Sequence, residues 1–242
     1  MTTAVIIQAR MNSTRLPGKV LFDLAGRTVL SHVLARCAAI GNADVVCCAV
    51  SNGRESDPIA EEAESCGVVV TRGSESDVLG RYFHAAETVG ADAILRVTSD
   101  CPLIDPEVCA GVLDLRQRED ADYACNNTPP SWPHGLDCEA FTMAALKRAY
   151  DEATLAEDRE HVTPWLRRHE DMKRVNYACP QADWTAQRWT LDYAADYTFF
   201  AALFDRLPAD TIAWRTVVRT IADDPDLTAL QAACRRPLAA PS

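Results

Sequence analysis

Three basic residues stand close together near the start of the chain, in a segment without acidic residues. They are Arg10, Arg15 and Lys19, within residues 9–19. Guanidinium groups match pairs of phosphate oxygens, lysine adds a compact positive charge, and the Ser13 hydroxyl can donate a further hydrogen bond. The segment lacks the glycine spacing of a Walker loop and of a dinucleotide-binding loop, so side chains would hold the phosphates. We expect a polyphosphate site here; the alternative is a solvated basic loop without a ligand.

Two aspartates, Asp100 and Asp192, each follow a short apolar run that is typical of a buried strand. Mg²⁺ prefers a few carboxylates together with waters and substrate phosphates, so two carboxylates delivered to one crevice would suit it. Aspartate is also a common residue at the N-terminal cap of a helix. A magnesium site and two helix caps are therefore the alternatives for this pair.

The elements that must position these side chains alternate between apolar runs of strand length and segments with apolar residues at helical spacing. This alternation predicts an α/β fold with a mostly parallel sheet flanked by helices on both faces, because parallel strands need crossover connections. In such sheets, ligands bind beyond the carboxyl ends of the strands. We expect strands over residues 4–8, 45–50, 68–70, 93–97 and 188–191, and helices over residues 30–38, 58–66, 77–89 and from 106 onward.

The strand and helix alternation is interrupted after residue 123. Residues 126–135 contain three prolines and predict a long loop. We expect one domain over residues 1–242 with an inserted subdomain at about 123–180. The remaining expected elements are helices over 143–153 and 158–168, a helix with an apolar face over 199–207, and a tail at 237–242.

The composition narrows the possible partners and the location. The formal net charge is −11, and an acidic surface repels nucleic acid and anionic membranes. None of the ten cysteines forms a Cys-x-x-Cys pair, and no apolar run approaches the length of about 20 residues that spans a bilayer. We therefore expect a cytoplasmic protein with reduced thiols, no nucleic-acid partner and no membrane insertion.

Several segments together resemble a known enzyme family. Gln8-Ala9-Arg10 with Ser13, the run Arg15-Leu16-Pro17-Gly18-Lys19 and residues 100–106 resemble the cytidylyltransferases that activate acidic sugars, such as CMP-sialate and CMP-Kdo synthetases. Residues 73–82, 135–141 and 159–164 resemble the spore-coat polysaccharide biosynthesis branch more closely. The resemblance spans about residues 5–197. One departure is Ala194-Ala195, where proline and glutamate are usual, so we expect an altered start of the helix that follows.

The resemblance implies a nucleotide-diphospho-sugar transferase fold, Rossmann-like in character, with CTP as donor and Mg²⁺ as cofactor. It implies Asp100 and Asp192 as the metal-binding carboxylates, and Arg10 and Lys19 beside them as catalytic residues. It also implies a homodimer, because such synthetases commonly dimerise through an inserted arm. The nucleotide-binding residues that it implies are Gln8, Ala9, Arg10, Ser13, Arg15, Lys19, Gly73, Ser74, Asp77, Thr98 and Asp100.

The implied reaction is in-line attack by an acceptor oxygen on the α-phosphorus of CTP, with pyrophosphate leaving. The acceptor would be a small acidic sugar or a phosphonate. The alternative for Glu160 and His161 is that both lie on an exposed helix face and bind no ligand. The polar candidates for acceptor binding are His134, Asp137, Glu139, Glu160 and His161.

Two other functional classes are compatible with the same features. A glycosyltransferase of polysaccharide biosynthesis, using a preformed nucleotide sugar, could employ this fold and a metal-binding aspartate. Release of pyrophosphate distinguishes a cytidylyltransferase from it. A binding protein without catalysis is the second alternative, and the presence of all three loop cations with both aspartates argues against it.

Overall fold

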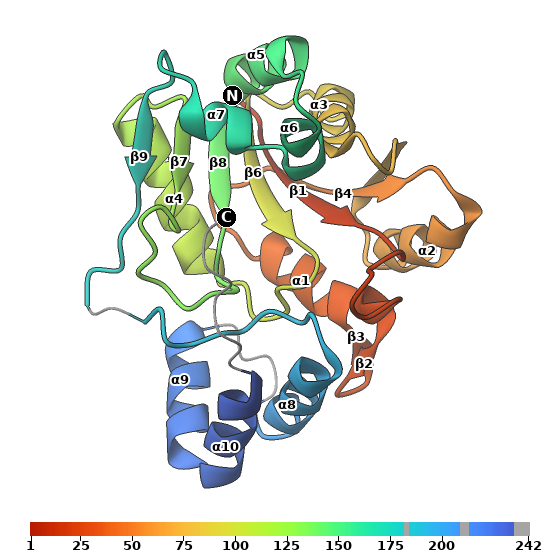
Figure 1. Cartoon of the computed structure of the whole chain (residues 1–242), viewed down its shortest axis with the longest axis vertical. Coiled ribbons are helices and arrows are strands. Elements are labelled where there is room, and N and C mark those ends of the chain that lie inside the picture. The colour runs from red at the N-terminus through yellow and green to blue at the C-terminus, as the bar shows by residue number, and fades with distance from the viewer. Residues whose placement is uncertain (182–183, 209–212, 235–242) are drawn as a thin grey trace.

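Successive residues of the central strands point to opposite faces of a seven-stranded sheet, and helices cover both faces (Figure 1). The protein is represented by a computed structural model that describes residues 1–181, 184–208 and 213–234. The expected tail at 237–242 lies outside these described residues. Two short strands, β2 (Asp23–Leu24) and β3 (Arg27–Thr28), form a separate antiparallel ribbon.

The strand order in the main sheet is β5-β4-β1-β6-β8-β7-β9. Strand β8 runs antiparallel to its neighbours β6 and β7, and the other adjacent pairs are parallel. The predicted mostly parallel sheet with helices on both faces is therefore confirmed. The strands are β1 (Thr3–Ala9), β4 (Val45–Ser51), β5 (Val69–Gly73), β6 (Ala93–Thr98), β7 (Tyr123–Cys125), β8 (Glu139–Thr142) and β9 (Arg174–Asn176).

Alternation along β1 divides the core into two layers. Val5 and Ile7 pack with helices α1 (Val29–Ala38), α2 (Asp57–Ser65) and α4 (Pro106–Arg118). Ala4 and Ile6 face the opposite layer, which contains α3 (Val78–Thr88) and α5 (Met143–Glu152). Short 3-10 helices, Lys19–Leu21 and Arg54–Ser56, precede α1 and α2.

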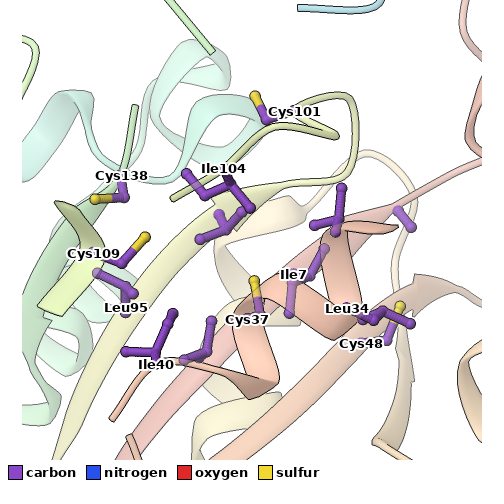
Figure 2. Close-up of a cluster of buried hydrophobic side chains, with 14 of the residues drawn as sticks. Ile7, Leu34, Cys37, Ile40, Cys48, Leu95, Cys101, Ile104, Cys109 and Cys138 are labelled. Atoms are coloured by element: carbon purple, nitrogen blue, oxygen red, sulfur yellow. The ribbon is translucent and has the colours of Figure 1, made fainter. Parts of the chain in front are cut away.

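Several of the cysteines belong to the first core layer and serve as small apolar side chains. Figure 2 shows Cys37, Cys48 and Cys109 among isoleucine and leucine side chains between the sheet and its helices. All ten cysteines, each within the described segments, are free. No helix in the described part of the chain is long and apolar enough to cross a membrane.

Three helices near the end of the chain form a third apolar cluster beyond the carboxyl ends of β1 and β6 (Figure 1). They are α8 (Ala194–Phe204), α9 (Trp214–Asp223) and α10 (Pro225–Cys234). Their apolar faces enclose Trp132 and Trp189. This packing places the segment just before α8 against the edge of the sheet where a ligand site was expected.

The predicted strand over residues 188–191 is wrong. Within this segment Arg188 forms a single isolated bridge with His134, and the following residues are irregular. Trp189 and Leu191 are both buried among the C-terminal helices, so the alternating apolar pattern comes from packing in a loop. The Leu191 amide nevertheless donates to the Asp100 carbonyl at 2.9 Å, which joins this loop to the end of β6.

The predicted helix over residues 158–168 is wrong as one element. It is two short helices, α6 (Ala156–His161) and α7 (Pro164–Arg168). Val162 between them has a φ of 71°, and Pro164 lacks the amide hydrogen needed to continue a helix. The predicted helix over 143–153 matches α5, and the apolar face expected over 199–207 belongs largely to α8.

Residues 123–180 contribute β7, β8 and β9 to the main sheet. Strand β8 connects these strands to the rest of the sheet, since it pairs with β6 on one side and with β7 on the other. The segment that was expected to form an inserted subdomain therefore continues the central sheet and adds helices α5, α6 and α7 over one face.

Candidate active site

A polar cavity opens at the carboxyl ends of β1 and β6, which are adjacent and parallel. Their register places Gln8 opposite Thr98, so the loops that follow the two strands start side by side. The loop after β1 supplies most of the wall, and α3 supplies one more side chain. The lining residues are Gln8, Ala9, Arg10, Ser13, Thr14, Arg15, Lys19, Val20, Arg81, Thr98, Ser99 and Asp100.

The loop after β1 folds back on itself before the chain enters α1. The amides of Ser13 and Gly18 both donate to the Met11 carbonyl, at 2.9 and 3.0 Å. Gly18 has a φ of 70°, a conformation that glycine adopts readily. This turn brings Lys19 inward, where its side chain is 9% exposed.

Lys19 joins the two predicted metal-binding aspartates. Its Nζ donates to Asp100 Oδ2 at 2.9 Å, to Asp192 Oδ1 at 3.0 Å and to the Leu191 carbonyl at 2.6 Å. Two carboxylates that are 92 positions apart in the sequence thus converge on one ammonium group. The predicted convergence of the basic loop and the two aspartates is what the structure shows.

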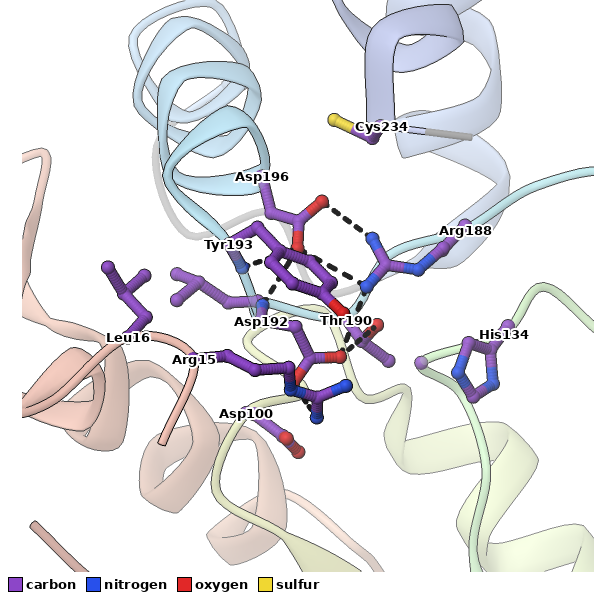
Figure 3. Close-up of polar contacts among 12 residues, drawn as sticks. Arg15, Leu16, Asp100, His134, Arg188, Thr190, Asp192, Tyr193, Asp196 and Cys234 are labelled. Carbon is purple, nitrogen blue, oxygen red and sulfur yellow. Dashed lines mark hydrogen bonds and ion pairs between the residues drawn. The ribbon is translucent and has the colours of Figure 1, made fainter. Parts of the chain in front are cut away.

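Two arginine side chains also form ion pairs with Asp192 (Figure 3). Arg15 donates to its Oδ1 at 2.6 Å, and Arg188 donates to its Oδ2 at 3.1 Å. Arg15 also lies over the ring of Tyr193, 5.2 Å from the ring centre. Both oxygens of Asp192 are therefore held by positively charged donors, so the carboxylate has a fixed orientation.

Asp196 fixes the backbone of the same loop. It is 1% exposed, and its Oδ2 accepts from the amides of Asp192 and Tyr193, at 2.8 and 2.9 Å. Arg188 donates to its other oxygen at 2.6 Å (Figure 3). Helix α8 thus begins at Ala194, so Ala194-Ala195 are its first two residues, with this cap in place. Sequence reasoning missed Arg188 and Asp196, although the four-residue spacing of Arg188, Asp192 and Asp196 was visible.

Neither predicted metal ligand caps a helix. The N-cap of α4 is Asp105, whose side chain accepts from the amides of Glu107 and Val108. Helix α8 has Tyr193 at its N-cap and Asp196 as the reciprocal partner. The helix-cap alternative for Asp100 and Asp192 is therefore wrong, and their carboxylates face the cluster around Lys19 instead.

The positive charge of Lys19 and the negative charge of Asp100 stabilise each other. Burial alone would lower the pKa of Lys19, but the neighbouring Asp100 and Asp192 leave that pKa above its ordinary value. Burial alone would raise the pKa of Asp100, but Lys19 and the hydroxyl of Thr98, which donates at 2.7 Å, leave it below its ordinary value. At neutral pH the ammonium and the carboxylate are both charged.

The donor set suits Mg²⁺ better than a metal that requires a complete cage of protein ligands. The described residues contain no group of three or more histidine, cysteine or acidic side chains that could hold a metal. Asp100 and Asp192 both lie within hydrogen-bonding distance of Lys19 Nζ, and the cavity beside them has room for phosphates and waters. Mg²⁺ is commonly bound by one or two carboxylates with substrate phosphates, so the residues fit it.

Of the predicted nucleotide-binding residues, Gly73 ends β5, and Ser74 and Asp77 lie in the loop that leads to α3. The Ser74 hydroxyl accepts from the Asp77 amide at 3.1 Å, and Asp77 caps α3 by accepting from the Gly80 amide at 2.9 Å. Asp77 borders a second cavity, which meets the first at Arg10. That second cavity is lined by Arg10, Glu75, Ser76, Asp77, Ala156, Arg159 and Glu160.

The predicted acceptor residues are spread over three places. His134 and Asp137 form a pair, with Nδ1 and Oδ2 2.7 Å apart, and Figure 3 shows His134 on the side of the cluster where Arg188 and Thr190 lie. The hydrogen bond to Asp137 raises the pKa of His134. Glu160 lines the second cavity, whereas the exposed His161 lines neither cavity.

Glu139 is placed differently from the expectation. Its side chain is 2% exposed and accepts from Arg96 and Arg167, each at 2.6 Å, and from the Tyr123 hydroxyl at 2.5 Å. Burial would raise the pKa of Glu139, but the two guanidinium groups lower it to about 2. This carboxylate lies outside both cavities and belongs to a buried network that links β8 with β6 and α7.

A profile of the family described as "Cytidylyltransferase" matches residues 4–198, which include both aspartates and the whole basic loop. The chain belongs to the cytidylyltransferase family. The predicted family is thus confirmed. The sequence reasoning identified the basic loop and both aspartates of this cytidylyltransferase, but it did not identify Arg81, which lines the cavity.

Known relatives of this cytidylyltransferase include proteins of the predicted branch. An uncharacterized protein of Methanocaldococcus jannaschii is 33% identical over 85% of each chain. The spore coat polysaccharide biosynthesis protein SpsF of Bacillus subtilis is 31% identical over 83% of this chain and 85% of its own. A 3-deoxy-manno-octulosonate cytidylyltransferase of Chelativorans is 37% identical over about half of each chain. A cytidylyltransferase structure from Leptospira borgpetersenii aligns over 99% of both chains, with a TM-score of 0.90 and 28% identity.

Proposed function

We propose that this cytidylyltransferase transfers CMP from CTP to a small acidic acceptor and releases pyrophosphate. Membership of the family and the similarity to an octulosonate cytidylyltransferase support this proposal. The observation that carries it is the convergence of Asp100 and Asp192 on Lys19, beside a cavity lined by further cations. Cations favour a polyphosphate, and paired carboxylates favour the metal that accompanies it.

The cavity suits an in-line displacement at the α-phosphorus. A bond forms between the acceptor oxygen and the α-phosphorus while the bond from that phosphorus to the oxygen bridging it to the β-phosphorus breaks. The electron pair leaves with pyrophosphate, and the proton of the acceptor hydroxyl passes to solvent water. Arg10 is exposed at the junction of the two cavities and would contact the β- and γ-phosphates. Fixed positive groups stabilise charge on the leaving group without reorganising during the reaction.

Asp100 and Asp192 are the residues that would hold Mg²⁺, which when bound neutralises phosphate charge. Lys19 keeps the two carboxylates together, so the ligands are preorganised. Arg188 and Asp196 fix the orientation of Asp192 through its second oxygen and its amide. Such supporting contacts commonly change metal affinity when they are removed.

The acceptor would approach from the side of His134 and Asp137. His134 is anchored by backbone hydrogen bonds to the segment that carries Asp192, since its amide donates to Gln187 and its carbonyl accepts from Trp189. Glu160 borders the cavity on the other side of Arg10 and is a second candidate for contacting a substrate. The homodimer and the cytoplasmic location implied by the sequence stay predictions.

The test exchanges each aspartate for its amide, Asp100→Asn and Asp192→Asn, which preserves shape and removes charge. We expect turnover, measured as pyrophosphate release, to fall at least roughly a hundredfold while the melting curve stays cooperative. A titration with Mg²⁺ distinguishes weakened metal binding, which excess metal restores, from lost transition-state geometry. Near-wild-type turnover of either variant throughout the titration would remove its aspartate from the metal site.

A further inference from the structure

Arg81 is a buried cation without a carboxylate partner. It is 2% exposed, yet it makes no ion pair with any described acidic residue, and its Nε has no hydrogen-bond acceptor. Among the described residues, its one side-chain hydrogen bond is from a terminal guanidinium nitrogen to the Ser74 carbonyl at 3.0 Å. The carboxylate of nearby Glu75 instead accepts from the Asn12 amide at 3.0 Å. A buried charge left in this state is costly unless another group neutralises it.

The position of Arg81 in α3 increases that cost. The helix starts at Val78, so Arg81 lies in its first turn, where the backbone amides already present positive charge. A cation is stabilised at the opposite end of a helix. Burial lowers the pKa of Arg81, and the nearby Arg10 lowers it further. The free protein therefore holds two neighbouring guanidinium groups, and the nearest carboxylate that influences Arg81, that of Glu75, forms no ion pair with it among the described residues.

Gly73 is what lets the Arg81 side chain reach this place. A β-carbon on Gly73 would lie 3.0 Å from Cγ and 3.1 Å from Cβ of Arg81, closer than such atoms normally approach. The end of β5 thus packs directly on the stem of Arg81, and Arg81 lines the cavity. The glycine that the family resemblance associates with the nucleotide acts here by making room for an arginine.

Two other cations of the cavity, Lys19 and Arg15, are already neutralised. Lys19 contacts Asp100 and Asp192, and Arg15 contacts Asp192. Arg10, like Arg81, has no carboxylate partner among the residues that the structure describes. The lining of the cavity thus includes two cations without an ion pair among the described residues, the exposed Arg10 and the buried Arg81.

We propose that Arg81 is a phosphate-binding residue of the nucleotide site and that a nucleotide phosphate is its missing counter-ion. This inference rests on the proposed function and names a contact within that site. A phosphate oxygen supplies both the acceptor that Nε lacks and the negative charge that the region lacks. A base or sugar oxygen would accept the hydrogen bond without neutralising the charge. Arg15 and Lys19 then serve mainly to hold the aspartates.

The test compares Arg81→Met, which keeps the stem and removes the charge, with Arg81→Lys, which keeps the charge. Binding of CTP, cytidine and inorganic pyrophosphate is measured by calorimetry at one fixed Mg²⁺ concentration. We expect Arg81→Met to weaken CTP and pyrophosphate roughly ten- to a hundredfold and to leave cytidine within about twofold. Arg81→Lys should retain a larger share of the pyrophosphate affinity, since the charge remains.

Arg116 provides the matched control. It is 5% exposed, its Nε also has no acceptor, and it donates to the Ala121 carbonyl, but it borders a separate cavity beside Met1 and Thr3. Arg116→Met removes an equally buried guanidinium, and we expect its affinity for CTP and pyrophosphate to equal that of the wild type. Equal losses in Arg116→Met and Arg81→Met would overturn the assignment.

Three results on Arg81 itself would also overturn it. Wild-type CTP affinity in Arg81→Met, with or without lower stability, would make Arg81 a structural arginine. Equal losses for cytidine and CTP would assign it to the base or sugar. In wild-type protein, an Arg81 Nε–H nuclear magnetic resonance signal that pyrophosphate does not move would overturn the contact even if the variants failed to fold. If wild-type protein binds pyrophosphate through Arg81 but does not turn over CTP with any acceptor, the proposed function is refuted and the assignment of Arg81 to phosphate binding is kept.

Discussion

Glu139→Gln tests whether this carboxylate is structural, as the geometry indicates, or an acceptor ligand, as the sequence suggested. The wild-type carboxylate is buried between Arg96 and Arg167, which lower its pKa from 4.5 to about 2. At about 1.4 kcal/mol for each pH unit, that difference corresponds to about 3 kcal/mol of folding free energy at pH 7. For a chain of 242 residues, the melting temperature should fall by roughly 6–12 °C.

The stabilisation that Glu139 provides should decrease as the pH falls, because the pKa of this carboxyl is lowered in the folded state. A carboxyl group with a lowered pKa in the folded state contributes stability that is present above its unfolded pKa of about 4.5, and this stability is lost as the pH falls toward 2. The stability difference between wild type and Glu139→Gln should therefore be constant near neutral pH and shrink below about pH 4.5.

Denaturant unfolding at several pH values measures the stability difference, and Glu160→Gln is the control because that carboxylate is exposed. We expect the KM for the acceptor to stay near the wild-type value in Glu139→Gln. An unchanged unfolding midpoint together with a raised acceptor KM would refute the structural role and restore the original expectation.

Three further variants address the site and the loop that carries it. Lys19→Met should lower pyrophosphate release at least roughly a hundredfold in a folded protein, because the carboxylates lose the cation that joins them; near-wild-type rates would contradict this. Arg188→Gln should raise the Mg²⁺ concentration for half-maximal activity roughly tenfold, since Asp192 and Asp196 lose a shared donor, and an unchanged metal titration would exclude this orienting role. Gly135→Ala should cost roughly 1–3 kcal/mol in denaturant unfolding, because φ is 111° and a β-carbon would meet the Trp189 carbonyl at 2.3 Å; unchanged stability would mean that the loop can move.

The sequence was sufficient to predict the convergence of the basic loop with Asp100. Both segments directly follow parallel strands, and the carboxyl ends of such strands meet at one edge of a sheet. Asp192 was assigned correctly to the same place although the strand predicted before it is absent. Its position depends on the hydrogen bond from Leu191 to Asp100 and on the burial of Trp189, neither of which a strand pattern describes.

Other features depend on contacts between distant segments. Glu139 is polar and lies in a family-like segment, but the pairing of β8 with β6 places it opposite Arg96 in the core. Arg81 is part of another family-like segment, and the structure is needed to show that it is buried against β5 and forms no ion pair with the described residues. The division between α6 and α7 is set by the backbone of Val162, whereas Pro164 alone was a visible signal.

The proposed reaction is transfer of CMP from CTP to an acidic acceptor. Its most direct measurement is pyrophosphate release from CTP, ATP, GTP and UTP with Mg²⁺, each against a panel of sugar acids and phosphonates, with reactions lacking acceptor as controls. We expect acceptor-dependent release of pyrophosphate with CTP, and rates at least roughly tenfold lower with the other three nucleotides. Equal release from all four nucleotides would contradict the proposed preference for CTP. No release from CTP with any acceptor, together with consumption of a nucleotide sugar without pyrophosphate, would contradict the proposed transfer of CMP.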